Sequence, residues 1–186
     1  MTSQGITLLL SATLIGAGTW AVRGDLLFHR ISNRLTGSLL CVGLAIRMLG
    51  SGWSGLEQSL LGVLVGLGCL LPFYIARAMG AGDVKLLAAT GGLLGPYDVW
   101  IAALCTLLIG AVLAVMYLAG GAVRAVVQAP AGSPWTMRVA HAHTRMQELR
   151  RERMPYALAI VLGSLAAIAQ SGELTRALSS IWGAAA

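Results

Sequence analysis

Long apolar stretches alternate with short polar ones along most of the chain. A helix crosses roughly 30 Å of hydrocarbon with about 20 mostly apolar residues. Six stretches have this character, and we expect each of them to cross a membrane as a helix. The fourth is the weakest, because thirteen residues give only about 20 Å of helix. The predicted spans are Gly5–Val22, Leu35–Leu49, Ser59–Ala78, Val84–Pro96, Val99–Val123 and Met154–Ala169.

The composition agrees with a bilayer environment. Of the 186 residues, 57% are hydrophobic and only 11% are charged, whereas soluble domains carry about 25% charged residues. The 24 glycines favour close approach between membrane helices. We therefore predict an all-α fold: one polytopic membrane domain over residues 1–186, built as a bundle of six transmembrane helices.

The basic residues predict the orientation of this bundle. In a six-span chain, 11 of the 13 lysines and arginines fall on one side, and basic loops face the cytoplasm. Both termini are then periplasmic, and residues 128–153 form a cytoplasmic basic loop between helices five and six. A five-span chain would scatter the basic loops over both faces. The net charge of +6 is explained by this topology, and we predict no nucleic-acid binding because no basic stripe with interleaved aromatic residues occurs.

Metal sites and disulfides are not expected. Cys41, Cys69 and Cys105 are widely spaced within apolar runs, form no C-x-x-C pair and are interpreted as small buried side chains. His141 and His143 form an H-x-H pair, but a zinc site needs further ligands and none lies nearby in the sequence.

Two aspartates are the candidates for chemistry, because acidic groups near membrane depth are costly and commonly functional. Asp83 ends the sequence G-A-G-D at Gly80–Asp83 and precedes the fourth span, where a helix N-terminus favours an anion. A glycine-rich turn with a helix cap accounts for this segment equally well. Asp25 precedes the second span and Asn33; by itself it is also compatible with a solvated loop aspartate paired with Arg23 or Arg30.

Together, the two segments indicate a pair of carboxyl groups that could act in one reaction. The chain crosses twice between Asp25 and Asp83, so both are predicted on the same face. One carboxylate can activate water while the other, protonated, polarises a carbonyl group, and two close carboxylates tend to share one proton.

The segment Gly80–Leu86, G-A-G-D-V-K-L, resembles the G-x-G-D signature of the type IV prepilin peptidases, a family of bacterial membrane aspartic peptidases. Arg30–Thr36 resembles the Ile-Pro-Asn-like segment that follows the family's first aspartate, with Ser32 where proline is usual. Arg153–Ala157 resembles the Pro-aromatic entry to the last span. Spans and motifs follow the family's order over nearly the whole chain.

The resemblance implies a peptidase of the bacterial inner membrane that removes basic leader peptides from type IV, Flp-like prepilins or pseudopilins at the cytoplasmic face. Asp25 and Asp83 would be catalytic. The chain is similar to the short, peptidase-only members, so neither N-methyltransferase activity nor a cofactor is expected. Prepilins and membrane lipids are the expected partners, and the oligomeric state stays open. The expected supporting or substrate-binding residues are Gly80, Gly82, Lys85, Asn33 and Pro155.

Two other interpretations remain open. A G-x-G-D protease resembling presenilin or signal peptide peptidase would cut inside transmembrane helices, but those enzymes pair their motif with Tyr-Asp, and no tyrosine precedes Asp25. A transporter or assembly subunit would use Arg47, inside the second span, on a transport path. Transporters are often built from internal repeats, and none is found here.

Overall fold

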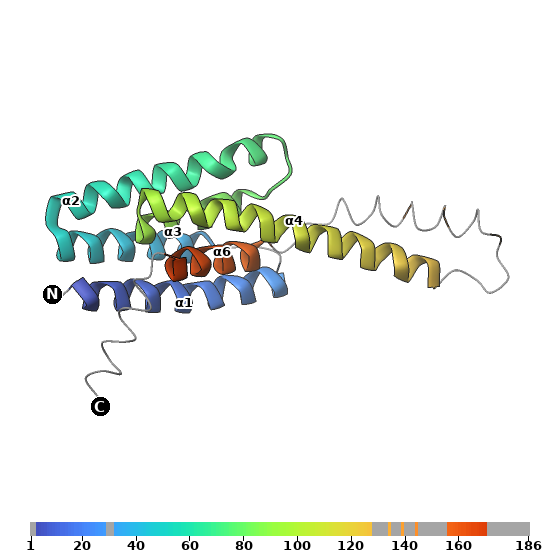
Figure 1. Ribbon diagram of the computed structural model, residues 1–186, viewed down its shortest axis with the longest axis horizontal. Coiled ribbons are helices and arrows are strands. Elements are labelled where there is room, and N and C mark those ends of the chain that lie inside the picture. The colour runs from blue at the N-terminus through green and yellow to red at the C-terminus, as the bar shows by residue number, and fades with distance from the viewer. Residues whose placement is uncertain are drawn as a thin grey trace, which may run out of the picture. The chain divides into compact units, whose positions relative to one another are not determined.

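The computed structural model describes residues 3–28, 32–127 and 156–170, and the single residues Pro134, Val139 and Thr144. The regular structure of these residues is entirely α-helical, which confirms the predicted all-α class (Figure 1). Apart from the three single residues, the predicted basic loop lies outside the described residues, as do His141, His143 and Pro155. The helices are α1 (Ser3–Phe28), α2 (Asn33–Ile75), α3 (Ala81–Leu94), α4 (Pro96–Val127) and α6 (Ala157–Gln170).

The chain divides into two compact units. Unit 1 comprises residues 1–107 and 155–186, and unit 2 comprises residues 108–154. Unit 1 contains α1, α2, α3, α6 and the first part of α4. Both candidate aspartates belong to unit 1.

Helix α2 bends sharply at Gly52. This residue has φ 60° and ψ −140°, a conformation that a Cβ atom disfavours. Arg47 and Gln58 lie eleven residues apart, about 16 Å along a straight helix, yet the Arg47 Nη1 donates a hydrogen bond to the Gln58 Oε1 at 3.2 Å. The two arms of α2 therefore fold back on each other (Figure 1). They overlap the second and third predicted spans, but the chain reverses at one glycine instead of through a loop.

Helix α3 is the buried helix of unit 1. Eleven of its 14 residues are buried, and it packs against α1, α2 and α6. Close approach to α2 depends on paired glycines: a Cβ atom on Gly62 would overlap the carbonyl oxygen of Gly91, and one on Gly91 would overlap the carbonyl oxygen of Gly62. The structure thus agrees with the close helix approach expected from the glycine content.

Arg47 caps the C-terminal end of α3. Its Nε donates to the Leu93 carbonyl oxygen at 2.9 Å, and its Nη2 donates to the Leu94 carbonyl oxygen at 2.5 Å. These carbonyls lack partners within the helix, and a cation near them is favoured by the helix dipole. Arg47, which a transporter would place on a transport path, therefore has a structural role at the end of α3.

We expect Arg47→Met to destabilise the fold by about 2 kcal/mol, the size of a hydrogen bond to a charged group. The change keeps most of the side-chain volume and removes the donors to Leu93 and Leu94. Unfolding by SDS, followed by circular dichroism, measures the loss. Arg34→Met is the control, since Arg34 is exposed on the same helix. Equal stability of the two variants would contradict the capping role.

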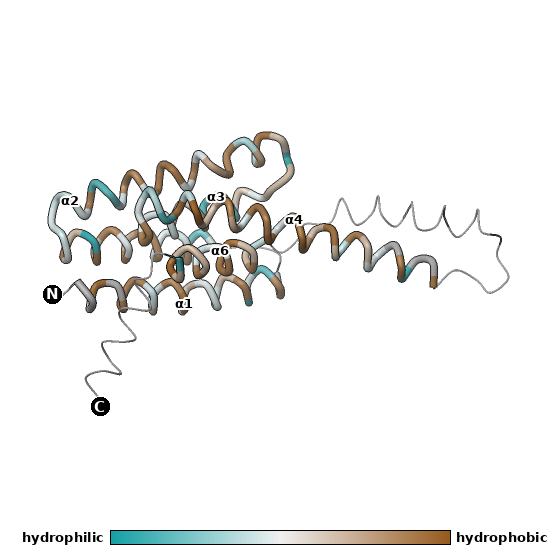
Figure 2. Tube along the Cα trace, viewed as in Figure 1, coloured by the Kyte–Doolittle hydropathy of each residue, from teal (hydrophilic) through white to brown (hydrophobic). Residues whose placement is uncertain are grey.

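Many large apolar side chains are exposed, and residues of high hydropathy occur along the described helices (Figure 2). Exposed apolar area on this scale is typical of contact with lipid or another protein. By length and composition, α2 and α4 are able to cross a membrane, so the chain fits a membrane protein; six spans stay a prediction. The expectation of buried cysteines is wrong for Cys41, which is exposed, while Cys69 and Cys105 are half-buried. Among the described residues, the large apolar side chains with the highest exposure are Leu49, Trp53, Val127, Tyr97, Ile75 and Trp20.

Candidate active site

One end of unit 1 brings together parts of four helices. Asp25 lies in the last turn of α1, Asn33 begins α2, and Asp83 lies in the first turn of α3. The Ala157 N–H, at the start of α6, donates to the Asp25 Oδ2 at 3.1 Å. The Lys85 Nζ donates to the Asn33 Oδ1 at 3.1 Å. Contacts between residues 132 and 52 positions apart thus converge on this end.

Asp25 is buried, with 7% of its surface exposed. The sequence predicted that the helix ends near Val22, whereas α1 continues to Phe28 and includes Asp25. The expected end marked only the end of the apolar stretch, and a helix is able to continue through polar residues. The last turn of α1 contacts the start of α6 through the hydrogen bond from the Ala157 N–H to Asp25. A solvated loop aspartate is therefore excluded, since Asp25 is neither in a loop nor exposed.

Asp83 is also buried, with 8% of its surface exposed. It is the third residue of α3, and its Oδ2 accepts a hydrogen bond from the Gly80 N–H at 3.2 Å. This contact is one half of a capping box, and the helix N-terminus favours the carboxylate. A cap explains the contact, but capping alone does not require burial of the carboxylate.

Tyr156 links Asp83 to the same end of the molecule. It stands in the turn before α6, outside the helix. Burial, and after it the negative charge of Asp83, raises the pKa of the Tyr156 phenol. Since the N–H of the next residue, Ala157, donates a hydrogen bond to Asp25, the start of α6 lies near both aspartates. Tyr156 and Ala157 were not predicted as site residues, although both belong to the Pro-aromatic segment.

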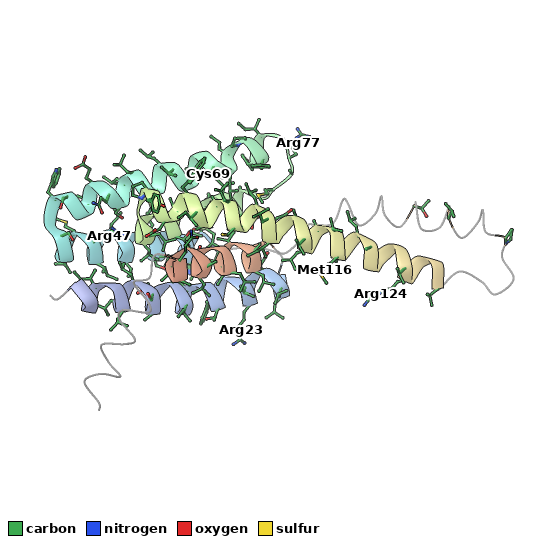
Figure 3. The ribbon with its side chains drawn as sticks, viewed as in Figure 1. Arg23, Arg47, Cys69, Arg77, Met116 and Arg124 are labelled. Atoms are coloured by element: carbon green, nitrogen blue, oxygen red, sulfur yellow. The ribbon has the colours of Figure 1, made fainter. Side chains whose placement is uncertain are left out.

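The other predicted site residues are partly accounted for. Gly80 donates to Asp83, and a Cβ atom on Gly80 would lie 3.2 Å from the Asp83 Oδ2. Gly82 is half-buried, beside Asp83. The exposed side chains of Lys85 and Asn33 form a hydrogen bond with each other. Pro155 lies outside the described residues. Arg23 and Arg77 are exposed and point away from the helices (Figure 3).

The chemistry available here is that of two carboxyl groups. Among the described residues there is no cluster of three or more His, Cys, Asp or Glu side chains that could hold a metal ion. Two buried carboxylates at one end of an apolar helical unit define a candidate acid–base site.

The fold and the site define a class of protein: the described residues form apolar helices, and two buried aspartates lie at one end of unit 1. A model of the type IV leader peptidase family matches residues 7–118, more than half of the 186 residues. The chain belongs to the type IV leader peptidase family. The match contains Asp25 and Asp83 and ends before α6. No curated protein and no solved structure gives a significant match.

Membership of the family makes the chain a peptidase, that is, a hydrolase, and implies prepilin substrates.

Proposed function

We propose that the chain is an aspartic endopeptidase in which Asp25 and Asp83 act together on one peptide bond. The observation that carries the proposal is the burial of both carboxyl groups at one end of unit 1, where the start of α6 lies near each of them. Burying an acidic group costs free energy, and capping a helix does not require a second carboxyl group on a neighbouring helix.

The reaction follows from the two protonation states. The ionised carboxylate takes a proton from a water molecule, whose oxygen attacks the carbonyl carbon of the scissile bond. The protonated carboxyl group hydrogen-bonds to the carbonyl oxygen and stabilises the charge that develops there. Collapse of the tetrahedral intermediate breaks the carbon–nitrogen bond, and a proton passes to the departing amine. No metal or cofactor takes part in this scheme.

The helix ends favour Asp83 as the ionised partner. Asp83 lies at the N-terminus of α3 and accepts the Gly80 amide, and both features stabilise an anion. Asp25 lies at the C-terminal end of α1, which disfavours an anion, while the Ala157 amide acts in the opposite direction. The pair titrates as a unit, so the assignment concerns the predominant form.

The substrates are Flp-like prepilins or pseudopilins, cleaved between a basic leader and an apolar helix. A site where four helix ends meet at the membrane boundary suits this junction, because water and an extended peptide segment reach it there. The distribution of basic residues supports a site on the cytoplasmic face of a bacterial inner membrane, with six spans and both termini periplasmic. N-methylation is not part of the proposed activity.

The test is the pH dependence of cleavage of a fluorogenic peptide, with a basic leader joined to an apolar segment, by the full chain in nanodiscs. We expect cleavage at the junction and a bell-shaped profile of kcat/KM with two limbs, because one carboxyl group must be ionised and the other protonated. Absence of cleavage, or a profile with a single limb, would contradict the proposal.

A further inference from the structure

The start of α6 supplies an amide that its own helix cannot use. The Ile160 N–H donates to the Tyr156 carbonyl oxygen at 3.1 Å, so Tyr156 is the N-cap and Ala157 is the first helical residue. The first amides of a helix have no acceptor within the helix. The Ala157 amide instead donates to the Asp25 Oδ2 at 3.1 Å.

We infer that the backbone amide of Ala157 is a positioning group, which orients the Asp25 carboxyl group and stabilises its ionised form when the proton shared by the pair resides on Asp83. This inference rests on the proposed function, because it assigns a role through Asp25. Ala157 is fully buried and Asp25 nearly so, and a hydrogen bond to an ionised group has a large effect where water does not compete.

Close packing fixes this amide in place. A Cβ atom on Gly163 of α6 would lie 2.5 Å from the Thr106 Oγ1 and 2.7 Å from the Ala102 carbonyl oxygen. Towards α1, a Cβ atom on Gly18 would lie 3.0 Å from two Val161 side-chain atoms. Helix α6 is therefore seated closely against both α4 and α1 within unit 1. A rigid helix gives its first amide a defined direction, as a positioning group needs.

The ionisable groups at this end come from every helix that packs against α1 and remain unchanged in the variants below. Burial, and after it the negative charge of Asp83, raises the pKa of the Tyr156 phenol beside the start of α6. The described ionisable groups at this end are Arg23 on α1, Arg34 and Tyr74 on α2, Arg77 after α2, Asp83 and Lys85 on α3, and Tyr156 before α6.

Ala157→Pro tests the inference, because proline lacks the N–H and is well tolerated as the first residue of a helix. Loss of the donor favours the neutral Asp25 carboxyl group. At least one limb of the kcat/KM profile should then move to higher pH by about one to two units. Ala157→Val is the matched control. Valine has a volume similar to that of proline but keeps the N–H, so both limbs of the kcat/KM profile should stay at the same pH.

A second variant keeps the inference testable if Ala157→Pro does not accumulate. Replacing Ala157 by lactic acid during cell-free synthesis exchanges the amide for an ester and removes the N–H with almost no change of shape. The same upward shift is expected. If both limbs stay unchanged in Ala157→Pro and in the ester-containing protein while Asp25→Asn is inactive, the role of the Ala157 amide is overturned and the proposed function is not. An active Asp25→Asn would instead overturn the proposed function.

Discussion

Asn in place of Asp25 or of Asp83 should lower prepilin cleavage at least about 100-fold in each variant, the lower range for removal of a general acid or base. Asparagine matches the shape of aspartate but cannot exchange a proton. In the proposed mechanism each carboxyl group has a task that the other cannot perform simultaneously. Cleavage in isolated membranes, with the amount of protein measured by immunoblot, checks this.

Glu57→Gln is the control for loss of a negative charge, since Glu57 is exposed on the second arm of α2, near the bend at Gly52 and away from the site. It should cleave like the unaltered protein. Near-normal cleavage by either aspartate variant would remove that residue from the mechanism.

Substituting leucine for Gly62 is expected to prevent accumulation of folded protein. The first side-chain atom would overlap the backbone of Gly91, which cannot move aside as a side chain can. Overpacking in a core commonly costs about 1–3 kcal/mol, and here α2 and α3 must separate. Because α3 carries Asp83 at its first turn, cleavage should be lost together with stability.

Gly68→Leu is the matched control in the same arm of α2. Gly68 is exposed, and a Cβ atom there would meet nothing within 4 Å. The same gain in helix propensity and apolar area therefore comes without overlap. Fluorescence-detected size-exclusion chromatography should give a monodisperse peak for Gly68→Leu alone. Equal peaks for both variants would contradict the close α2–α3 contact.

Apolar segment length predicted much of the fold. The all-α class followed from six apolar stretches, and the last of them, Met154–Ala169, nearly coincides with α6, Ala157–Gln170. A loop was predicted where α2 bends, because Gly50, Ser51, Gly52 and Ser54 are residues typical of loops. Local sequence does not reveal that helix persists on both sides of one glycine with positive φ.

For the site, the sequence singled out the two aspartates but not their surroundings. G-A-G-D identified Asp83 through its glycines and its position before an apolar stretch. Asp25 accepts a hydrogen bond from Ala157, 132 residues away, and an alanine carries no chemical signal in a sequence. Its contribution is a backbone amide, which every residue except proline possesses, so only the fold identifies it.

Whether Asp25 and Asp83 act as one unit is tested by the cleavage rate of the double variant Asp25→Asn/Asp83→Asn, compared with those of the single variants under single-turnover conditions. Groups that act as one unit show strongly non-additive effects. We expect the double variant to be no slower than the slower single variant, within a few-fold. Single variants that each retain activity, with losses that multiply in the double variant, would contradict a shared site.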